Sequence, residues 1–188
     1  GSSEEPQGPV QGFARPLDGG SLVVQTEFAS SAKRAKKRVA LLGVDAPDTH
    51  QQCLDSDGEA LWPCGLRAAG ALRQLVSGKV VTCKFPEGGA KDASGRLRGV
   101  CSTQGLSGDD VPDIGARLVK DGHAVADHTT TRYALEEASA QRAGKGVWRQ
   151  GGAFVRPWRW REGERLEVEA ASAAIAEETA AAGAEERV

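Results

Sequence analysis

Residues 38–48 read RVALLGVDAPD, and this stretch carries most of the information about the fold. Residues 39–44 are apolar, which predicts a buried strand. The strand runs into a turn that carries two carboxylates, Asp45 and Asp48. These carboxylates are candidates for a site. The alternative is that an Asp placed two residues before a Pro bonds nearby backbone amides in an Asx-turn.

The elements on either side of this strand predict a small β-barrel. Several short strands with a helix between the third and the fourth are the pattern of an OB-fold. The expected elements are strands at 13–28 and 39–44, a helix at 66–76, a hairpin over 80–101, and helices at 113–120 and 132–143. The sequence therefore predicts an α+β, mainly β, fold: a five-stranded OB-fold barrel with about three helices.

Four cysteines and no methionine favour two disulfides formed in an oxidising compartment. Cys83 and Cys101 are equidistant from the turn signal at 91–95. They should therefore face each other across the hairpin with Cβ atoms about 4.5–5.5 Å apart, which approaches disulfide geometry. Cys53 and Cys64 would then close a short loop. The alternatives are four buried thiols, or a metal site that lacks the usual C-x-x-C spacing.

The two ends of the chain differ in composition from the body, which is predicted to be one domain over 13–162. Residues 1–12 are polar and start with what looks like a tag scar, so they are expected to be disordered and to replace a native signal peptide or anchor. Residues 163–188 are rich in Ala and Glu, and from 167 onward they hold six Glu and one Arg. No apolar stripe organises this acidic tail, so it is expected to be largely disordered.

The remaining body is mildly basic, which permits a polyanion as partner without requiring one. No run of 18 apolar residues is present, so the sequence predicts no membrane span. The segment 157–161 interleaves Trp with Arg. Such a pattern can stack on nucleic-acid bases or can pack a C-terminal segment onto the body.

Four motifs, taken in order and spacing, resemble the staphylococcal nuclease (thermonuclease) family over about residues 13–160. They are DGGS at 18–21, VDAPD at 44–48, DASGR at 92–96 and EASAQRAGKGVW at 137–148. The paired cysteines and the WPCG at 62–65 resemble secreted or periplasmic bacterial members, which implies that localisation. Some rhizobial relatives carry an exopolysaccharide (succinoglycan) biosynthesis label.

The resemblance implies calcium-dependent phosphodiester hydrolysis, in which a Glu activates water and two Arg side chains neutralise the phosphate. It assigns metal ligation to Asp18, Asp45 and the carbonyl of Ala46. Gly20 stands where the family has a second metal-binding Asp, so Ca²⁺ is expected to bind only weakly.

The resemblance assigns catalysis to Asp48 and Arg96, but two departures weaken the assignment. Asp48 replaces the family's Glu, and losing one methylene moves the carboxylate by about 1 Å, enough to cost on the order of 100-fold. Ala40 replaces the first phosphate Arg. Arg38 lies two residues earlier on the same strand face and is the candidate substitute. Starting about 6.5–7 Å further back, it would lose bidentate geometry.

His128 aligns near the family's active-site Tyr and is a candidate acid; the alternative is a surface histidine without a role. Together these features predict a thermonuclease-like domain with an impaired site, non-catalytic or weakly active, that binds a polyanion such as nucleic acid or acidic polysaccharide. One alternative is a calcium-dependent nuclease acting on DNA or RNA. The other is an exported accessory protein of succinoglycan-type exopolysaccharide biosynthesis.

Overall fold

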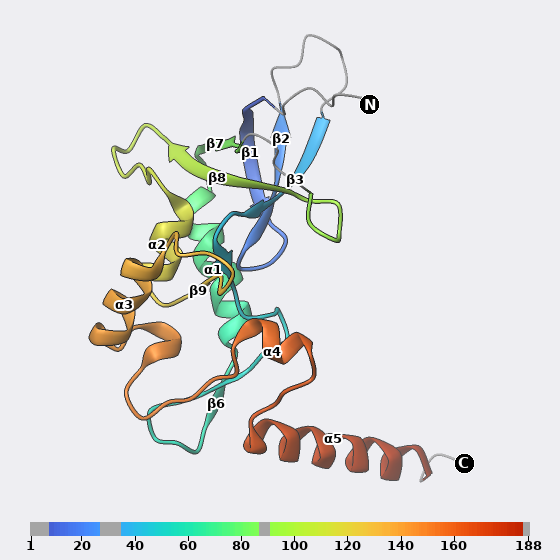
Figure 1. Cartoon of the computed structure of the whole chain (residues 1–188). Coiled ribbons are helices and arrows are strands. Elements are labelled where there is room, and N and C mark those ends of the chain that lie inside the picture. Colours follow the sequence, from blue (N-terminus) through green and yellow to red (C-terminus); the bar gives the residue numbers. More distant parts are fainter. Residues whose placement is uncertain (1–7, 27–34, 87–90, 186–188) are drawn as a thin grey trace.

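Residues 8–26, 35–86 and 91–185 are described by a computed structural model, in which five strands form a closed barrel (Figure 1). The order around the barrel is β1-β2-β3-β8-β7, with β3 and β8 parallel and the other neighbours antiparallel. The strands are β1 (Val10–Pro16), β2 (Ser21–Thr26), β3 (Ala35–Leu41), β7 (Val80–Lys84) and β8 (Leu97–Gln104). The five-stranded barrel predicted from the sequence is confirmed.

Buried and exposed residues alternate along most of the barrel strands, so that one face of each of these strands points into the barrel and the other points outward. In β3, Val39 and Leu41 are buried, whereas Lys36 and Arg38 are exposed. This period of two is what a strand with one face on a core requires. The outer face of β3 therefore carries basic side chains, including part of the basic run at 33–38; residues 33 and 34 lie outside the described residues.

Helices cover one end of the barrel and continue away from it (Figure 1). Ala68, Leu72 and Val76 of the first helix are spaced four residues apart and are buried, so they form one stripe against the core. The helices are α1 (Cys64–Val76), α2 (Ile114–Lys120), α3 (Ala134–Ala143), a 3₁₀ turn (Gly146–Trp148), α4 (Pro157–Arg161) and α5 (Glu167–Glu185).

A second, smaller core lies beyond the barrel. Val147 and the two cysteines Cys53 and Cys64 are buried in it, with Trp148 and Trp158 packed against them. Trp158 belongs to the Trp- and Arg-rich segment, which therefore packs onto the body. Two ribbons of two-residue strands border this region: β4 (Val44–Asp45) with β9 (Val125–Ala126), and β5 (Cys53–Leu54) with β6 (Leu61–Trp62).

Both predicted disulfides are present. Cys83 and Cys101 are direct partners in the antiparallel pairing of β7 with β8, with Cα atoms 4.1 Å apart. Cys53 and Cys64 are joined with Cα atoms 5.7 Å apart, and this bond ties β5 to the start of α1. The prediction that Cys83 and Cys101 face each other, made because they are equidistant from the hairpin turn, is therefore confirmed.

Three expectations about the ends and the helix content need correction. Strand β1 begins at Val10, inside the segment expected to be disordered; residues 1–7 lie outside the described residues. The described part of the chain holds five α-helices rather than about three. The acidic tail is helical over Glu167–Glu185. Ala and Glu are strong helix formers, and Glu167 and Glu169 in the first turn favour the helix dipole, so propensity prevails where no apolar stripe exists.

Among the described residues, no helix combines the length and the apolar character needed to cross a membrane. Helix α5 has the length, but its many Glu residues give it an unsuitable composition.

Candidate ligand-binding site

A cavity of about 410 Å³ opens at the rim of the barrel. Eight charged side chains line it, and they come from segments far apart in the sequence. The carboxylates are Asp18, Asp45, Asp48, Asp92 and Asp127, and the arginines are Arg96, Arg98 and Arg161. The barrel topology gathers them, because the β1–β2 turn, the end of β3 and the start of β8 meet at this rim.

Asp45 is bound by an arginine from the Trp- and Arg-rich segment 157–161, a role that the sequence did not predict. Arg161, the last residue of α4, donates from Nη1 and Nη2 to the two Asp45 carboxylate oxygens at 3.0 and 2.8 Å. The Asp45 side chain is 15% exposed and that of Arg161 47%. Burial raises the pKa of Asp45 above its ordinary value while Arg161 acts in the opposite direction. The hydrogen bonds to Asp45 raise the pKa of Arg161, so this guanidinium stays charged.

Arg96 is held between two other carboxylates. Its Nε donates to Asp92 at 2.8 Å, and its Nη1 reaches Asp18 at 3.3 Å and the hydroxyl of Ser21 at 2.9 Å. Burial would raise the pKa of Asp92, but hydrogen bonds from Ser94 and Arg96 outweigh it and hold that pKa below the ordinary value. The other Asp18 oxygen accepts from the Gly20 amide at 2.8 Å.

Six of the residues to which the resemblance gave a candidate role line the cavity, and one does not. Those at the cavity are Asp18, Asp45, Ala46, Asp48, Arg96 and His128. Their chemical roles remain predictions. Arg38 shares the outer face of β3 with Ala40 but is not a lining residue, so the structure does not bring it to the cavity.

A different arginine, Arg98, lines the cavity beside Ala40. It is paired with Ala40 in the parallel alignment of β3 and β8, and both residues line the cavity. Within the described residues the Arg98 side chain makes no hydrogen bond or ion pair, and it is exposed. The sequence signal was a second arginine two residues after Arg96; only Arg98 lies in β8, because Arg96 precedes the strand. This spacing could point to the cavity only once the β3–β8 pairing was known, and the sequence did not reveal that pairing.

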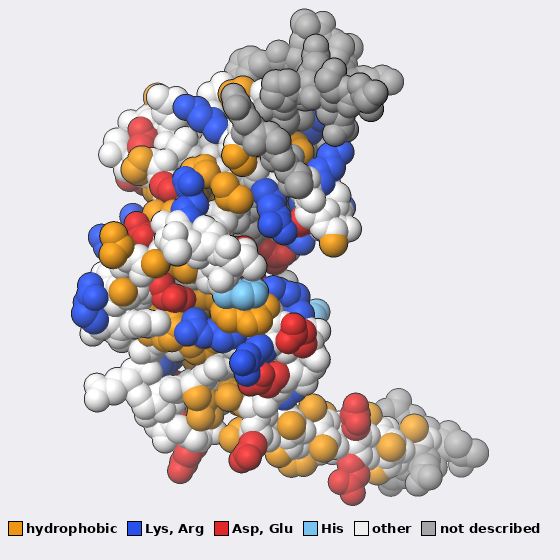
Figure 2. All heavy atoms as spheres, viewed as in Figure 1, with side chains coloured by type: hydrophobic (Ala, Val, Ile, Leu, Met, Phe, Trp, Pro, Cys, Tyr) orange, Lys and Arg blue, Asp and Glu red, His pale blue; other side chains and the backbone are white. Residues whose placement is uncertain are grey.

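His128 lies at the rim of the cavity against α4. Its ring stacks on that of Trp158 with centroids 4.2 Å apart, and Nδ1 is 3.8 Å from Asp127. Arg156, just before α4, pairs with Glu137 at 3.2 Å and lies over the Trp148 ring. Figure 2 shows Lys and Arg side chains next to Asp and Glu side chains over α4. The segment that carries Arg161 is therefore fixed by aromatic and ionic contacts.

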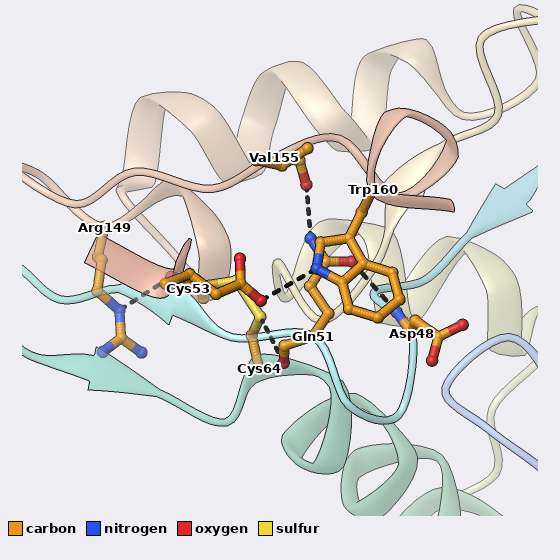
Figure 3. The surroundings of a disulfide bond; sticks show 9 residues. Asp48, Gln51, Cys53, Cys64, Arg149, Val155 and Trp160 are labelled. Carbon is orange, nitrogen blue, oxygen red and sulfur yellow. Dashed lines mark hydrogen bonds between the residues drawn. A yellow bond between two sulfur atoms is a disulfide. The ribbon is translucent and has the colours of Figure 1, made fainter. Parts of the chain in front are cut away.

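Gln51 connects the Asp48 turn to this C-terminal segment. It is fully buried; its Oε1 accepts from the Asp48 amide at 3.2 Å and its Nε2 donates to the Val155 carbonyl at 2.6 Å. Figure 3 shows the Gln51 side chain between Val155 and Asp48, beside the Cys53–Cys64 disulfide. A buried amide with both ends bonded fixes the relative position of the two segments.

The two carboxylates that the resemblance assigns to calcium, Asp45 and Asp18, do not fit the ion as they are paired here. Calcium takes six to eight oxygen ligands, of which carboxylates are the main charged ones. Here both Asp45 oxygens bind Arg161, and the Asp18 oxygens bind Gly20 and Arg96. Gly20 adds no carboxylate. In the described residues no group of three or more His, Cys, Asp or Glu side chains is arranged to hold a metal.

The barrel, the acidic cavity at its rim and the arginine at the start of β8 define a thermonuclease-like protein with an OB-fold. The family model described as staphylococcal nuclease homologue matches residues 38–150, and the chain belongs to this family. The chain is also similar to the succinoglycan biosynthesis protein ExoI of Rhizobium meliloti (strain 1021). The two are 33% identical over 141 residues, which is 73% of this chain and 68% of that protein.

Proposed function

We propose that this protein is a non-catalytic or weakly active member of its family that binds a polyanion at the cavity rim. The observation that carries the proposal is Arg98, an exposed guanidinium at the cavity without a partner among the described residues. Arg96 next to it is already paired with Asp92 and Asp18. Arg98 is therefore the arginine most available to an incoming anionic group.

The approach of a polyanion is favoured along the outer face of β3 rather than from the acidic side of the cavity. Lys36 and Arg38 are exposed on that face, and Arg98 continues it on β8. Figure 2 shows blue side chains over the region where β3 and β8 cross. On the same outer face Phe13 is 49% exposed and lies in the strand row of Gln25 and Lys36. Basic side chains beside an exposed aromatic ring suit a single-stranded nucleic acid.

Weak or absent catalysis follows from the state of the carboxylates. Asp45 and Asp18 are engaged by arginines, and Asp48 is shorter than the family's Glu. Hydrolysis through these residues would need the ion pairs to open first. In this proposal the protein retains the fold and the exposed Arg98, whereas its hydrolytic centre is impaired.

Incubation with single-stranded DNA and millimolar calcium tests this proposal, with Asp48→Ala and Arg96→Ala as matched variants. We expect labelled DNA to be retained and to remain uncut, and retention to weaken as salt rises. Calcium-dependent cleavage that both substitutions abolish would support the nuclease alternative instead. Absence of any salt-dependent binding to a polyanion would overturn the proposal.

A second candidate function is an exported accessory role in succinoglycan-type exopolysaccharide biosynthesis. It is favoured by the similarity to a protein named for succinoglycan biosynthesis and by the two disulfides. Competition separates the two ligand classes. If an acidic polysaccharide displaces DNA at lower charge concentration than unlabelled DNA does, this second function is supported.

A further inference from the structure

Arg161 lies among the carboxylates that the family resemblance assigns to a metal ion and to the general base. Its guanidinium binds both oxygens of Asp45. Asp48 and Asp18 also act on it electrostatically, because both help to hold the Arg161 pKa above its usual value. A positive charge is thus already present where three carboxylates converge.

The position of this charge is fixed by the fold rather than by the ion pair alone. Arg161 ends α4, whose Trp158 stacks on His128. The preceding chain is bonded to Gln51 through the Val155 carbonyl. Because α4 is docked, its backbone is already ordered, and only the Arg161 side chain loses conformational freedom when the ion pair forms.

Gly20 also lines the cavity and has no side chain of its own. A Cβ built on Gly20 would lie 3.4 Å from the Ala46 Cβ and 3.9 Å from an Asp18 oxygen, ordinary contact distances, and Gly20 does not adopt a positive φ. Position 20 would therefore accept a Cβ without a clash, so the backbone does not prevent an Asp there. The nearest charge that would repel a cation at Asp45 comes from Arg161.

We propose that Arg161 is a built-in cation that takes the place of a divalent metal at Asp45, so that this site does not recruit calcium. A divalent ion at Asp45 would have to displace the guanidinium and then tolerate its charge nearby. The proposal goes beyond polyanion binding and does not depend on it. Arg161 lies outside the part of the chain that the family model matches, residues 38–150.

Calcium titration calorimetry tests the proposal on the wild type, Arg161→Gln, Gly20→Asp, and the Gly20→Asp/Arg161→Gln double variant. We expect no saturable binding to the wild type or to Gly20→Asp at millimolar calcium. The double variant should bind one calcium at least tenfold more tightly than either single variant. Adding Asp45→Asn to the double variant should abolish that binding.

Two results would overturn the inference. One is a wild type that binds one calcium as tightly as Arg161→Gln does. The other is a folded double variant that binds none, because something other than Arg161 would then close the site. If Gly20→Asp prevents folding, the Arg161→Gln variant alone tests the inference. Calcium should then raise the thermal midpoint of Arg161→Gln and leave that of the wild type unchanged. Equal shifts in the two proteins would refute the inference. DNA retention measured on the same samples judges the proposed function separately.

Discussion

Arg98 lies beside Ala40 in the parallel pairing of β3 with β8, and both line the cavity. The neighbouring strand therefore brings a guanidinium to the cavity beside Ala40, the position at which the family resemblance expects an arginine. We infer that Arg98 can take over the anion contact expected there.

Replacing Arg98 should weaken polyanion binding more than replacing Arg38. We expect Arg98→Ala to reduce affinity for single-stranded DNA about tenfold and to lower the salt slope by about one, because one charge-assisted contact is lost. Arg38→Ala should have a smaller effect. Arg142→Ala is the matched control, since Arg142 is exposed on α3. Equal losses for all three variants would show a non-specific charge effect and would contradict the role of Arg98.

Tyr133 should make the stability of the protein fall at alkaline pH. Burial, together with the hydrogen bonds that its hydroxyl donates to Asp113 at 2.8 and 2.9 Å, raises the pKa of Tyr133 to about 12. Because the folded pKa exceeds the unfolded value near 10, the contribution is complete below pH 10. It is lost as pH rises toward 12, at a cost of about 2–3 kcal/mol.

The chain has one tyrosine, so tyrosinate absorbance reports this group directly. Denaturant unfolding between pH 9 and 12 should show the decline in the wild type and a shallower one in Tyr133→Phe. The same slope in both proteins, or titration of the absorbance near pH 10 in the folded state, would contradict the prediction.

Gln51→Leu should destabilise the protein by about 2–4 kcal/mol. The substitution keeps the approximate volume but leaves the Asp48 amide and the Val155 carbonyl without their partner, and a buried unsatisfied group costs about 1–3 kcal/mol. Urea unfolding measures the loss. Gln141→Leu, at an exposed position of α3, is the control and should change stability by less than about 0.5 kcal/mol. A neutral Gln51→Leu would mean that water or a local shift satisfies both groups.

Each disulfide should contribute about 3 kcal/mol to the free energy of unfolding. The bonds span 18 residues between Cys83 and Cys101 and 11 residues between Cys53 and Cys64. Loop-closure entropy for such spans is about 3 kcal/mol. Urea unfolding of Cys83→Ala/Cys101→Ala and of Cys53→Ala/Cys64→Ala should give similar losses. A wild type in which all four thiols alkylate without reductant would refute both bonds.

Removing α5 should change helicity but hardly affect the barrel. Most of its described side chains are exposed, and its contact with the preceding segment includes one hydrogen bond from Trp160 to Glu169 at 3.1 Å. A chain ending at Leu166 should lose far-ultraviolet helical signal while its unfolding free energy falls by no more than about 1 kcal/mol. A larger fall would show that α5 packs more firmly than its exposure indicates.

The sequence predicted the features that depend on local pattern. The apolar strand before Asp45 and the turn that pairs Cys83 with Cys101 were identified from spacing and turn residues, and both are present. The order of the elements was enough to predict the barrel. Residues matched to family motifs also came together at one cavity.

The features that were missed depend on contacts between distant segments. Arg98 became relevant only through the parallel β3–β8 pairing. Arg161 reaches Asp45 across 116 residues of sequence, and no periodicity reports such a return of the chain. The helix at 167–185 was missed for a different reason, because the absence of an apolar stripe was weighted above the intrinsic propensity of Ala and Glu.

The C-terminal segment is held at the cavity by a small set of polar and aromatic contacts, so we expect it to open locally. Undocking residues 153–161 would withdraw Arg161, break the bond from Gln51 to Val155 and leave the Asp45 carboxylate uncompensated, with the barrel intact. Amide hydrogens of the Asp48 turn and of α4 should then exchange with a common opening free energy, below that of β3 and β8. The net charge of the cavity would therefore change each time this segment undocks, even though the barrel stays folded.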